Sequence, residues 1–175
     1  MQDVEMLYSA ESIRNRIKAL TGEILRSHAG DEIVLIGLLN GCFMFISDLA
    51  RALSATPIRI SVDFMKVSSY GDSQQSSGEV RVLQDIHLSI HGRPVLVVDD
   101  ILDSGHSLST ALRILRTHAP KSLRTCVLLD KSGRRQVEIR PDFTGFEAPN
   151  RFVVGYGLDY AEQYRALPYI GALKS

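Results

Sequence analysis

Closely spaced acids and hydroxyls mark the stretch of this sequence that is best suited to chemistry. Two adjacent acids, Asp99 and Asp100, follow an apolar run at 95–98, and a polar turn reading Asp-Ser-Gly-His-Ser begins at Asp103. Carboxylates repel a phosphate but bind a divalent cation or sugar hydroxyls, and one of them can take up a proton. A turn of small polar residues before a helix offers backbone N–H groups and a positive helix end to a phosphate. The stretch therefore combines groups for a phosphate with groups for a cation or a sugar.

This stretch is expected to lie between a buried strand and a helix. Residues 95–98 are apolar and rich in β-branched side chains, which is typical of a strand buried on both faces of a parallel sheet. Leucines recur at helical spacing over 107–118. A simple alternative is that Asp103 or Ser104 caps this helix and binds no ligand. The stretch lacks both the Gly-Lys-Ser/Thr of a P-loop and the GxGxxG of a dinucleotide site.

Helical and strand patterns alternate along the rest of the chain. Helices are expected over 10–28, 42–53 and 107–118, and strands over 32–38, 58–67, 79–83, 95–98, 123–130 and 152–156, with a short element at 143–147 and a closing segment at 168–173. This alternation predicts an α/β fold with a mainly parallel central sheet flanked by helices. Ligands of such sheets gather at the carboxyl ends of the strands, which would bring 39–41, 99–107, Lys131 and 152–159 around one cleft. With no internal repeat and no linker in the sequence, residues 1–175 are expected to form a single domain.

One polar stretch, SSYGDSQQSSG at 68–78, interrupts these patterns. Its composition favours a disordered surface loop. A loop of this length inside a compact domain is also the usual form of an active-site lid. Both interpretations are open at the level of the sequence.

Composition excludes several classes of protein. The 175 residues are 45% hydrophobic and 23% charged, and 20 basic residues balance 20 acidic ones, which argues against a nucleic-acid or membrane partner. No apolar run approaches the roughly 20 residues that a membrane helix needs, and the N-terminal residues do not form a secretory signal. Cys42 and Cys126 lie in apolar settings without metal-ligand spacing, which favours free thiols and a cytoplasmic protein.

The stretch 95–107 resembles the phosphoribosyl-diphosphate motif of the phosphoribosyltransferases: a hydrophobic strand, two acids, two apolar residues and an Asp-Ser-Gly turn. Lys131 in KSGRR and the string FVVGYGLDY at 152–160 resemble the hypoxanthine-guanine branch, and the resemblance covers nearly the whole chain. It implies the type I phosphoribosyltransferase fold with a small hood and a mobile lid loop. The implied reaction transfers ribose 5-phosphate from 5-phosphoribosyl 1-diphosphate to hypoxanthine or guanine, giving IMP or GMP and diphosphate. The resemblance also implies a Mg²⁺ cofactor and a homodimer or homotetramer.

The resemblance further implies a role for each matching residue. Asp103 matches the general base near N7 of the purine. The residues that match phosphoribosyl and phosphate contacts are Asp99, Asp100, Asp103, Ser104, Gly105, His106, Ser107, Asn40, Gly41 and Arg165. Those that match purine contacts are Lys131, Phe152, Val153, Ile101 and Leu158. Ser69 and Tyr70 match the lid, and Asp159, Asp99 and Asp100 match the metal-binding acids.

Two positions depart from the family pattern. Asn40 stands where the family commonly has lysine, and Asp99 stands where it more often has glutamate.

Three other functions compete with this interpretation. Orotate and uracil phosphoribosyltransferases share the acidic motif but lack KSGRR together with FVVGYGLDY. A regulatory RNA-binding protein on the same fold would need a basic face, whereas the charges here balance. A nucleotide-sensing domain without activity is the third. An assay of diphosphate release with several bases separates them.

Overall fold

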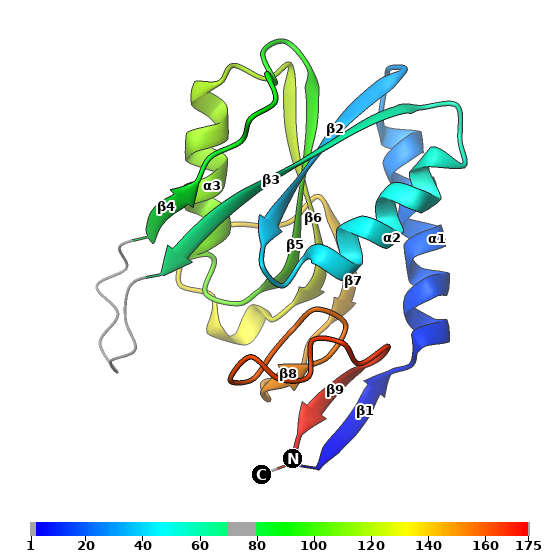
Figure 1. Cartoon of the computed structure of the whole chain (residues 1–175), viewed down its shortest axis with the longest axis vertical. Coiled ribbons are helices and arrows are strands. Elements are labelled where there is room, and N and C mark those ends of the chain that lie inside the picture. Colours follow the sequence, from blue (N-terminus) through cyan, green and yellow to red (C-terminus); the bar gives the residue numbers. More distant parts are fainter. Residues whose placement is uncertain (1–2, 70–79, 175) are drawn as a thin grey trace.

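A six-stranded sheet forms the centre of the protein (Figure 1). The structure is a computed structural model that describes residues 3–69 and 80–174. In the strand order β4-β3-β2-β5-β6-β7 all neighbours are parallel except β3 and β4, so the prediction of a mainly parallel sheet is confirmed. The strands are β2 (Glu32–Leu39), β3 (Arg59–Ser69), β4 (Val80–Gln84), β5 (Pro94–Leu102), β6 (Ser122–Asp130) and β7 (Phe143–Glu147).

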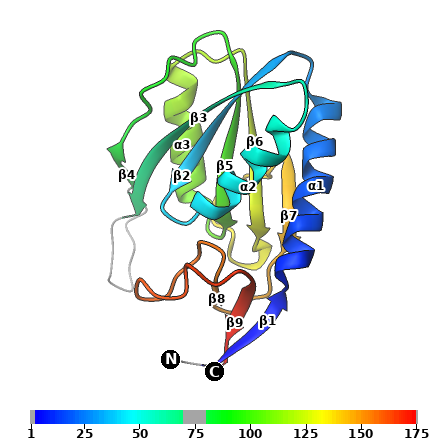
Figure 2. The ribbon, with the colours of Figure 1, turned by 45° about the vertical axis from the view of Figure 1, so that its right-hand side comes forward.

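Helices cover both faces of this sheet (Figure 2). Helices α1 (Ala10–Ser27) and α2 (Phe43–Ser54) share one core cluster with alternate residues of β2, such as Ile33 and Leu35. Helix α3 (His106–Thr117) packs on the other face with the intervening residues Val34 and Ile36. The apolar runs in the sequence are therefore strands buried on both sides, as expected of a parallel sheet. No helix within the described residues is long and apolar enough to span a membrane.

A second, antiparallel sheet forms a hood beyond the carboxyl ends of the central strands (Figure 1). Its order is β1-β9-β8, from β1 (Val4–Tyr8), β9 (Ile170–Leu173) and β8 (Val153–Val154). Strand β1 was not predicted, because its side chains are partly or fully exposed and its partner β9 lies at the other end of the chain. The hood that the resemblance implied is thus present, and both ends of the chain contribute to it.

The elements around the acidic stretch differ from the prediction in two ways. Strand β5 continues to Leu102, so Asp99 lies within the ladder opposite Val127 and not beyond its end. Helix α3 takes Gly105 as its N-cap, in a left-handed conformation with a φ of 93°, and no side chain caps it. The interpretation of Asp103 or Ser104 as a simple helix cap is therefore wrong.

One further strand departs from the prediction. The strand expected over 152–156 shortens to Val153–Val154, because Gly155, Tyr156 and Gly157 all take positive φ values and turn the chain. After β6, residues Ser132–Arg134 form a single 3-10 turn, η1. Most of the polar stretch at 68–78 lies outside the described residues.

Candidate active site

A cavity of about 320 Å³ opens where β2 and β5 end, beneath the hood. It joins four segments of the chain: the end of β2, Val67 of β3, the stretch from the end of β5 into α3, and the loop after β8. The predicted site residues that line it are Asn40, Gly41, Asp99, Asp100, Ile101, Asp103, Ser104, Gly105, Ser107, Asp159 and Arg165. Most of the phosphoribosyl group of residues therefore lies together, as the strand-end rule predicts.

Gly41 is the point at which these segments touch. A β-carbon on Gly41 would overlap the Oδ2 atom of Asp100, and a β-carbon on Gly157 would overlap the carbonyl oxygen of Gly41. The peptide bond between Leu39 and Asn40 is cis. The loop after β2 is thus held between the acidic strand and the loop after β8, at a distance that only glycine permits.

The two adjacent acids differ in their surroundings. Asp99 is buried, and its Oδ1 atom accepts the backbone N–H of Asp100 at 3.0 Å. Burial, followed by the charge of Asp100, raises the pKa of Asp99 well above its ordinary value. Burial also raises the pKa of Asp100, although the nearby Arg165 favours its charged form. The pair therefore holds a proton more readily than two exposed carboxyl groups would.

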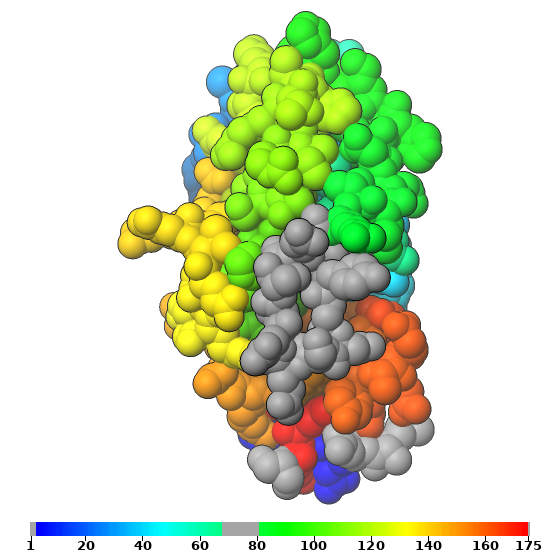
Figure 3. Space-filling view, turned by 90° about the vertical axis from the view of Figure 1, so that its left-hand side faces the viewer, coloured from blue at the N-terminus to red at the C-terminus, as the bar shows by residue number. Residues whose placement is uncertain are grey.

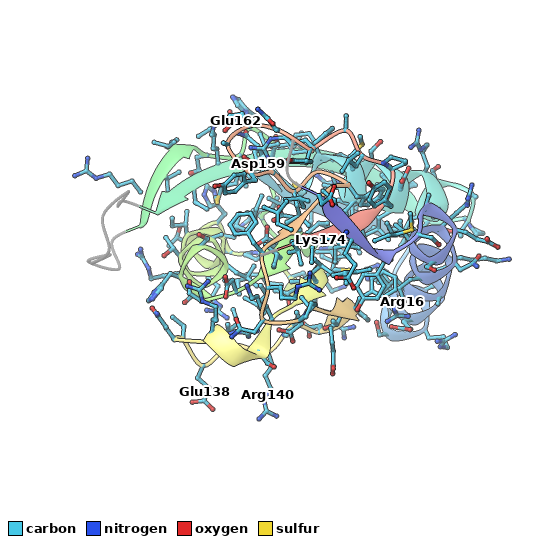
Figure 4. The ribbon with its side chains drawn as sticks, turned by 90° about the horizontal axis from the view of Figure 1, so that it is seen from below. Arg16, Glu138, Arg140, Asp159, Glu162 and Lys174 are labelled. Atoms are coloured by element: carbon cyan, nitrogen blue, oxygen red, sulfur yellow. The ribbon has the colours of Figure 1, made fainter. Side chains whose placement is uncertain are left out.

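Arg165 places a cation at the cavity. Its Nη2 atom lies 2.9 Å from Oδ1 of Asp159, and its Nη1 atom donates to the carbonyl of Gly157 at 2.9 Å. The other Asp159 oxygen accepts the backbone N–H of Glu162 at 3.0 Å. Figure 4 shows Asp159 and Glu162 on the edge of the molecule opposite Glu138 and Arg140. The loop is thus cross-linked by its own arginine, which keeps one carboxylate and one guanidinium at the cavity.

The turn at 103–107 combines polar side chains with a helix start. Ser104 and Ser107 line the cavity, and the first N–H groups of α3 have no partner within the helix itself. His106 is different, because its ring Nε2 atom makes a hydrogen-bond contact of 2.9 Å with Oε1 of Gln136 and it does not line the cavity. The turn is therefore suited to an anion, with His106 outside the contact surface.

Lys131 and Asp103 form a donor and an acceptor side by side. Lys131 is buried, and its Nζ atom donates to the carbonyl of Arg151 at 3.1 Å and lies 3.9 Å from Oδ2 of Asp103. Arg134 approaches the same oxygen to 3.8 Å. Within the part of the chain that the structure describes, the buried Oδ1 atom of Asp103 has no hydrogen-bond partner. A cation and a carboxylate at this spacing can read the edge of a heterocyclic base.

The remaining purine contacts expected from the resemblance are dispersed. Phe152 is 53% exposed and meets Tyr160 edge to face, with ring centroids 5.2 Å apart. Val153 and Leu158 are buried in the hood, outside the residues that line the cavity. Tyr160 was not predicted, and its only signal in the sequence is its place at the end of FVVGYGLDY. Among the lid residues, Ser69 is the last residue of β3 and Tyr70 lies outside the described residues.

Comparison with known proteins agrees with this site. The family model for the phosphoribosyl transferase domain matches residues 3–161. The hypoxanthine-guanine phosphoribosyltransferase of Bacillus subtilis is 44% identical over 173 residues, which cover 98% of this chain and 94% of that protein. The hypoxanthine phosphoribosyltransferase of Escherichia coli K12 is 45% identical over 170 residues, 96% of this chain and 94% of that protein.

Solved structures show the same likeness. The crystal structure of a hypoxanthine-guanine phosphoribosyltransferase from Bacillus anthracis, with a HEPES molecule in its active site, superposes with a TM-score of 0.91 at 40% identity, covering 98% of this chain and 100% of that one. The hypoxanthine phosphoribosyltransferase of Trypanosoma cruzi, in a ternary substrates complex, gives a TM-score of 0.91 at 40% identity and covers 99% of this chain and 96% of that one.

These matches define an enzyme of the phosphoribosyltransferase class. Within that class, the chain belongs to the hypoxanthine-guanine phosphoribosyltransferase family. The resemblance, the fold class and the enzyme class expected from the sequence are therefore confirmed.

Proposed function

We propose that the protein transfers ribose 5-phosphate from 5-phosphoribosyl 1-diphosphate to hypoxanthine or guanine, giving IMP or GMP and diphosphate. One observation carries this proposal: a single cavity joins the anion-binding turn at 103–107 to the acid pair, and Asp103 links that turn to the buried Lys131. Together these groups provide for the phosphate, the ribose and the base of the product. The relatives named above support the choice of base.

Each part of the cavity has one task in the transfer. Backbone N–H groups of the 103–107 turn, with the hydroxyls of Ser104 and Ser107, hold the 5-phosphate. Asp99 and Asp100 hold the ribose hydroxyls. The bond between the anomeric carbon and the diphosphate breaks, and the leaving group stays between the loop of Asn40 and Gly41 and the guanidinium of Arg165. His106 contributes its backbone alone, because its ring is engaged with Gln136.

The base is read by a donor and deprotonated by an acceptor. Lys131 donates to the exocyclic oxygen of the 6-oxopurine, and the carboxylate of Asp103 accepts the proton that the base loses as its new bond to the sugar forms. Phe152 stacks on the ring, the backbone of Val153 meets its edge, and Ile101 and Leu158 complete the apolar contacts. A positioned general base contributes about 10²–10⁴-fold to such a transfer.

The cavity also fits a magnesium ion bound together with the diphosphate. Three carboxylates, those of Asp99, Asp100 and Asp159, line it, and such hard oxygen ligands suit Mg²⁺. Within residues 3–69 and 80–174 no three metal-ligating side chains gather into a cage of their own. Mg²⁺ usually takes one or two carboxylates and completes its shell with water and substrate phosphates. When bound, it neutralises charge on the leaving group.

The test measures diphosphate release with hypoxanthine, guanine, xanthine, adenine and uracil, with Mg²⁺ and after chelation with EDTA. We expect turnover with hypoxanthine and guanine that chelation abolishes and Mg²⁺ restores. Asp103→Asn, which keeps size and removes basicity, should lower turnover about 10²–10⁴-fold with a much smaller change in base affinity. Turnover with uracil alone, or with none of the bases, would exclude the proposal, and full activity after chelation would exclude the role of the metal.

Five further properties accompany this proposal. We propose that residues 1–175 form one domain, supported by a core cluster that includes both α1 and the hood residue Ile170. We propose no nucleic-acid or membrane partner, in line with the balance of 20 basic and 20 acidic residues. A cytoplasmic location agrees with the free thiols of Cys42 and Cys126. Family membership favours a homodimer or homotetramer, and light scattering tests this oligomeric state. It also favours closure of Ser69 and Tyr70 over the substrates, and limited proteolysis with and without ligands tests this closure.

A further inference from the structure

The turn at 103–107 rests on a segment that the phosphate motif does not include. The backbone N–H groups of Gln136 and Val137 both donate to the carbonyl of Ser104, at 2.9 and 3.2 Å. A β-carbon on Gly105 would lie 3.0 Å from Cγ2 of Ile139, so the two segments are in close contact. Figure 3 shows this segment (yellow) beside α3 (yellow-green) on one face of the molecule. The anion-binding turn thus has a support on the side away from the cavity.

Arg135 is the centre of this support. Its Nε atom donates to the carbonyl of Asp103 at 3.1 Å, and its Nη2 atom donates to the carbonyl of Leu102 at 3.4 Å. Its Nη1 atom donates to the carbonyl of Ile139 at 2.5 Å, and the carboxylate of Asp130 pairs with Nη2. The side chain is only 17% exposed. Arg135 therefore joins the end of β5, the start of the turn and the supporting segment through one planar group.

Binding these carbonyls also aims the N–H groups that follow them. In a trans peptide unit the C=O of one residue and the N–H of the next lie in one plane and point in opposite directions. Holding the carbonyl of Leu102 therefore directs the N–H of Asp103 away from Arg135, and holding the carbonyl of Asp103 directs the N–H of Ser104 in the same way. The two hydrogen bonds to the Ser104 carbonyl likewise direct the N–H of Gly105 away from the supporting segment. Three successive N–H groups are thus set by contacts on the opposite side of the turn.

We propose that Arg135 is a positioning residue that presets these N–H groups for the 5-phosphate of the substrate and of the nucleotide product. The inference rests on the proposed function, because it takes the 103–107 turn as the phosphate site. Arg135 lies behind the turn and does not line the cavity, so it acts through the backbone and not by contact with the ligand. A fixed array of donors binds an anion without first having to be ordered.

Arg16 provides a matched control for the alternative that Arg135 only stabilises the fold. Its Nε and Nη2 atoms donate to the carbonyls of Gly145 and Thr144 at 2.8 and 2.6 Å, and Nη1 pairs with Glu23 at 2.6 Å. Arg16 is likewise partly buried, and it joins α1 to β7 away from the cavity. The same kind of arginine, bound to backbone carbonyls and one carboxylate, thus occurs at a site with no phosphate turn.

The experiment compares Arg135→Met and Arg135→Lys with Arg16→Met and Arg16→Lys in the full chain. Titration calorimetry measures the affinity for IMP, and initial rates give the KM for phosphoribosyl diphosphate and, separately, for hypoxanthine. We expect Arg135→Met to weaken IMP binding and raise the KM for phosphoribosyl diphosphate about 10- to 100-fold, with the KM for hypoxanthine nearly unchanged. Arg135→Lys keeps the charge but not the fork of donors, so it should recover only part of the loss. The Arg16 variants should lower the melting temperature and leave both affinities as they are.

Several results would overturn the inference. Folded Arg135 variants that bind IMP like the wild type would exclude it, and so would Arg16 variants with an equal loss of affinity. Where Arg135→Met does not fold, Arg135→Lys and Asp130→Asn provide the same test, since Asp130→Asn removes the carboxylate that holds the guanidinium. A folded wild-type protein that does not bind IMP at all would instead refute the proposed function itself, which distinguishes the two failures.

Discussion

Replacement of Lys131 by methionine tests how the site recognises the base. The Lys131 side chain is only 7% exposed, and the one hydrogen bond described for its ammonium goes to the carbonyl of Arg151. The ammonium has no acceptor site, so it pairs with the 6-oxo group of hypoxanthine and opposes the 6-amino group of adenine. Methionine keeps the packing of the stem and removes the charge.

The size of the effect follows from this burial. A hydrogen bond to a charged group is worth about 1.5–3 kcal/mol, which corresponds to about 10- to 150-fold in kcat/KM. We expect Lys131→Met to lower kcat/KM for hypoxanthine by that factor and to leave the slow adenine rate unchanged or higher. Sites built on buried polar groups reject a mismatched partner by about 10⁴-fold, which is the preference for hypoxanthine over adenine that we expect of the wild type. Because only the hypoxanthine value falls in Lys131→Met, this preference should shrink by the same factor of about 10 to 150.

Initial rates of diphosphate release at saturating phosphoribosyl diphosphate, with each base varied in turn, give the two values of kcat/KM. Lys121→Met serves as the control, because Lys121 is exposed just before β6, at the end of that strand opposite Lys131. A wild-type protein that uses adenine as well as hypoxanthine would refute this role of Lys131. A Lys131→Met protein with an unchanged preference would refute it equally.

Three more changes test other parts of the site. Gly41→Ala should weaken phosphoribosyl diphosphate binding about 10- to 100-fold by calorimetry, because its β-carbon would displace the carboxylate of Asp100, and an unchanged affinity would contradict this contact. The raised pKa of Asp99 means that the folded state keeps a proton which the unfolded state releases above about pH 4, so stability falls as pH rises from there toward the raised pKa. Asp99→Asn should therefore gain stability over the wild type increasingly with pH in thermal melts, and a gain independent of pH would count against the shift. Tyr160→Ala should raise the KM for the purine about two- to tenfold by releasing the ring of Phe152, whereas Tyr160→Phe should not.

Much of the framework follows from the sequence because local patterns carry it. The apolar run before Asp99 is a strand buried on both faces, as β-branched content and length predict, since both are properties of a few consecutive residues. The turn at 103–107 is the start of a helix for the same reason. The rule that parallel strands present their carboxyl ends to one edge then predicts which loops meet. That rule correctly brought 39–41 and most of 99–107 to one cavity, whereas of Lys131 and residues 152–159 only Asp159 lines it.

Contacts between distant segments were decided by the tertiary structure alone. Strand β1 exists because β9, from the other end of the chain, offers it an edge to pair with, and its own residues show no strand pattern. The burial of Asp99 and the short distance from Lys131 to Asp103 depend on how β5 and β6 pack, which no local pattern records. Arg135 resembles any other arginine after a strand until the carbonyls of the turn are placed around it. Residue type and local periodicity determine which chemical groups are available. How deeply each side chain is buried, and where it points, is decided only when the whole chain is packed.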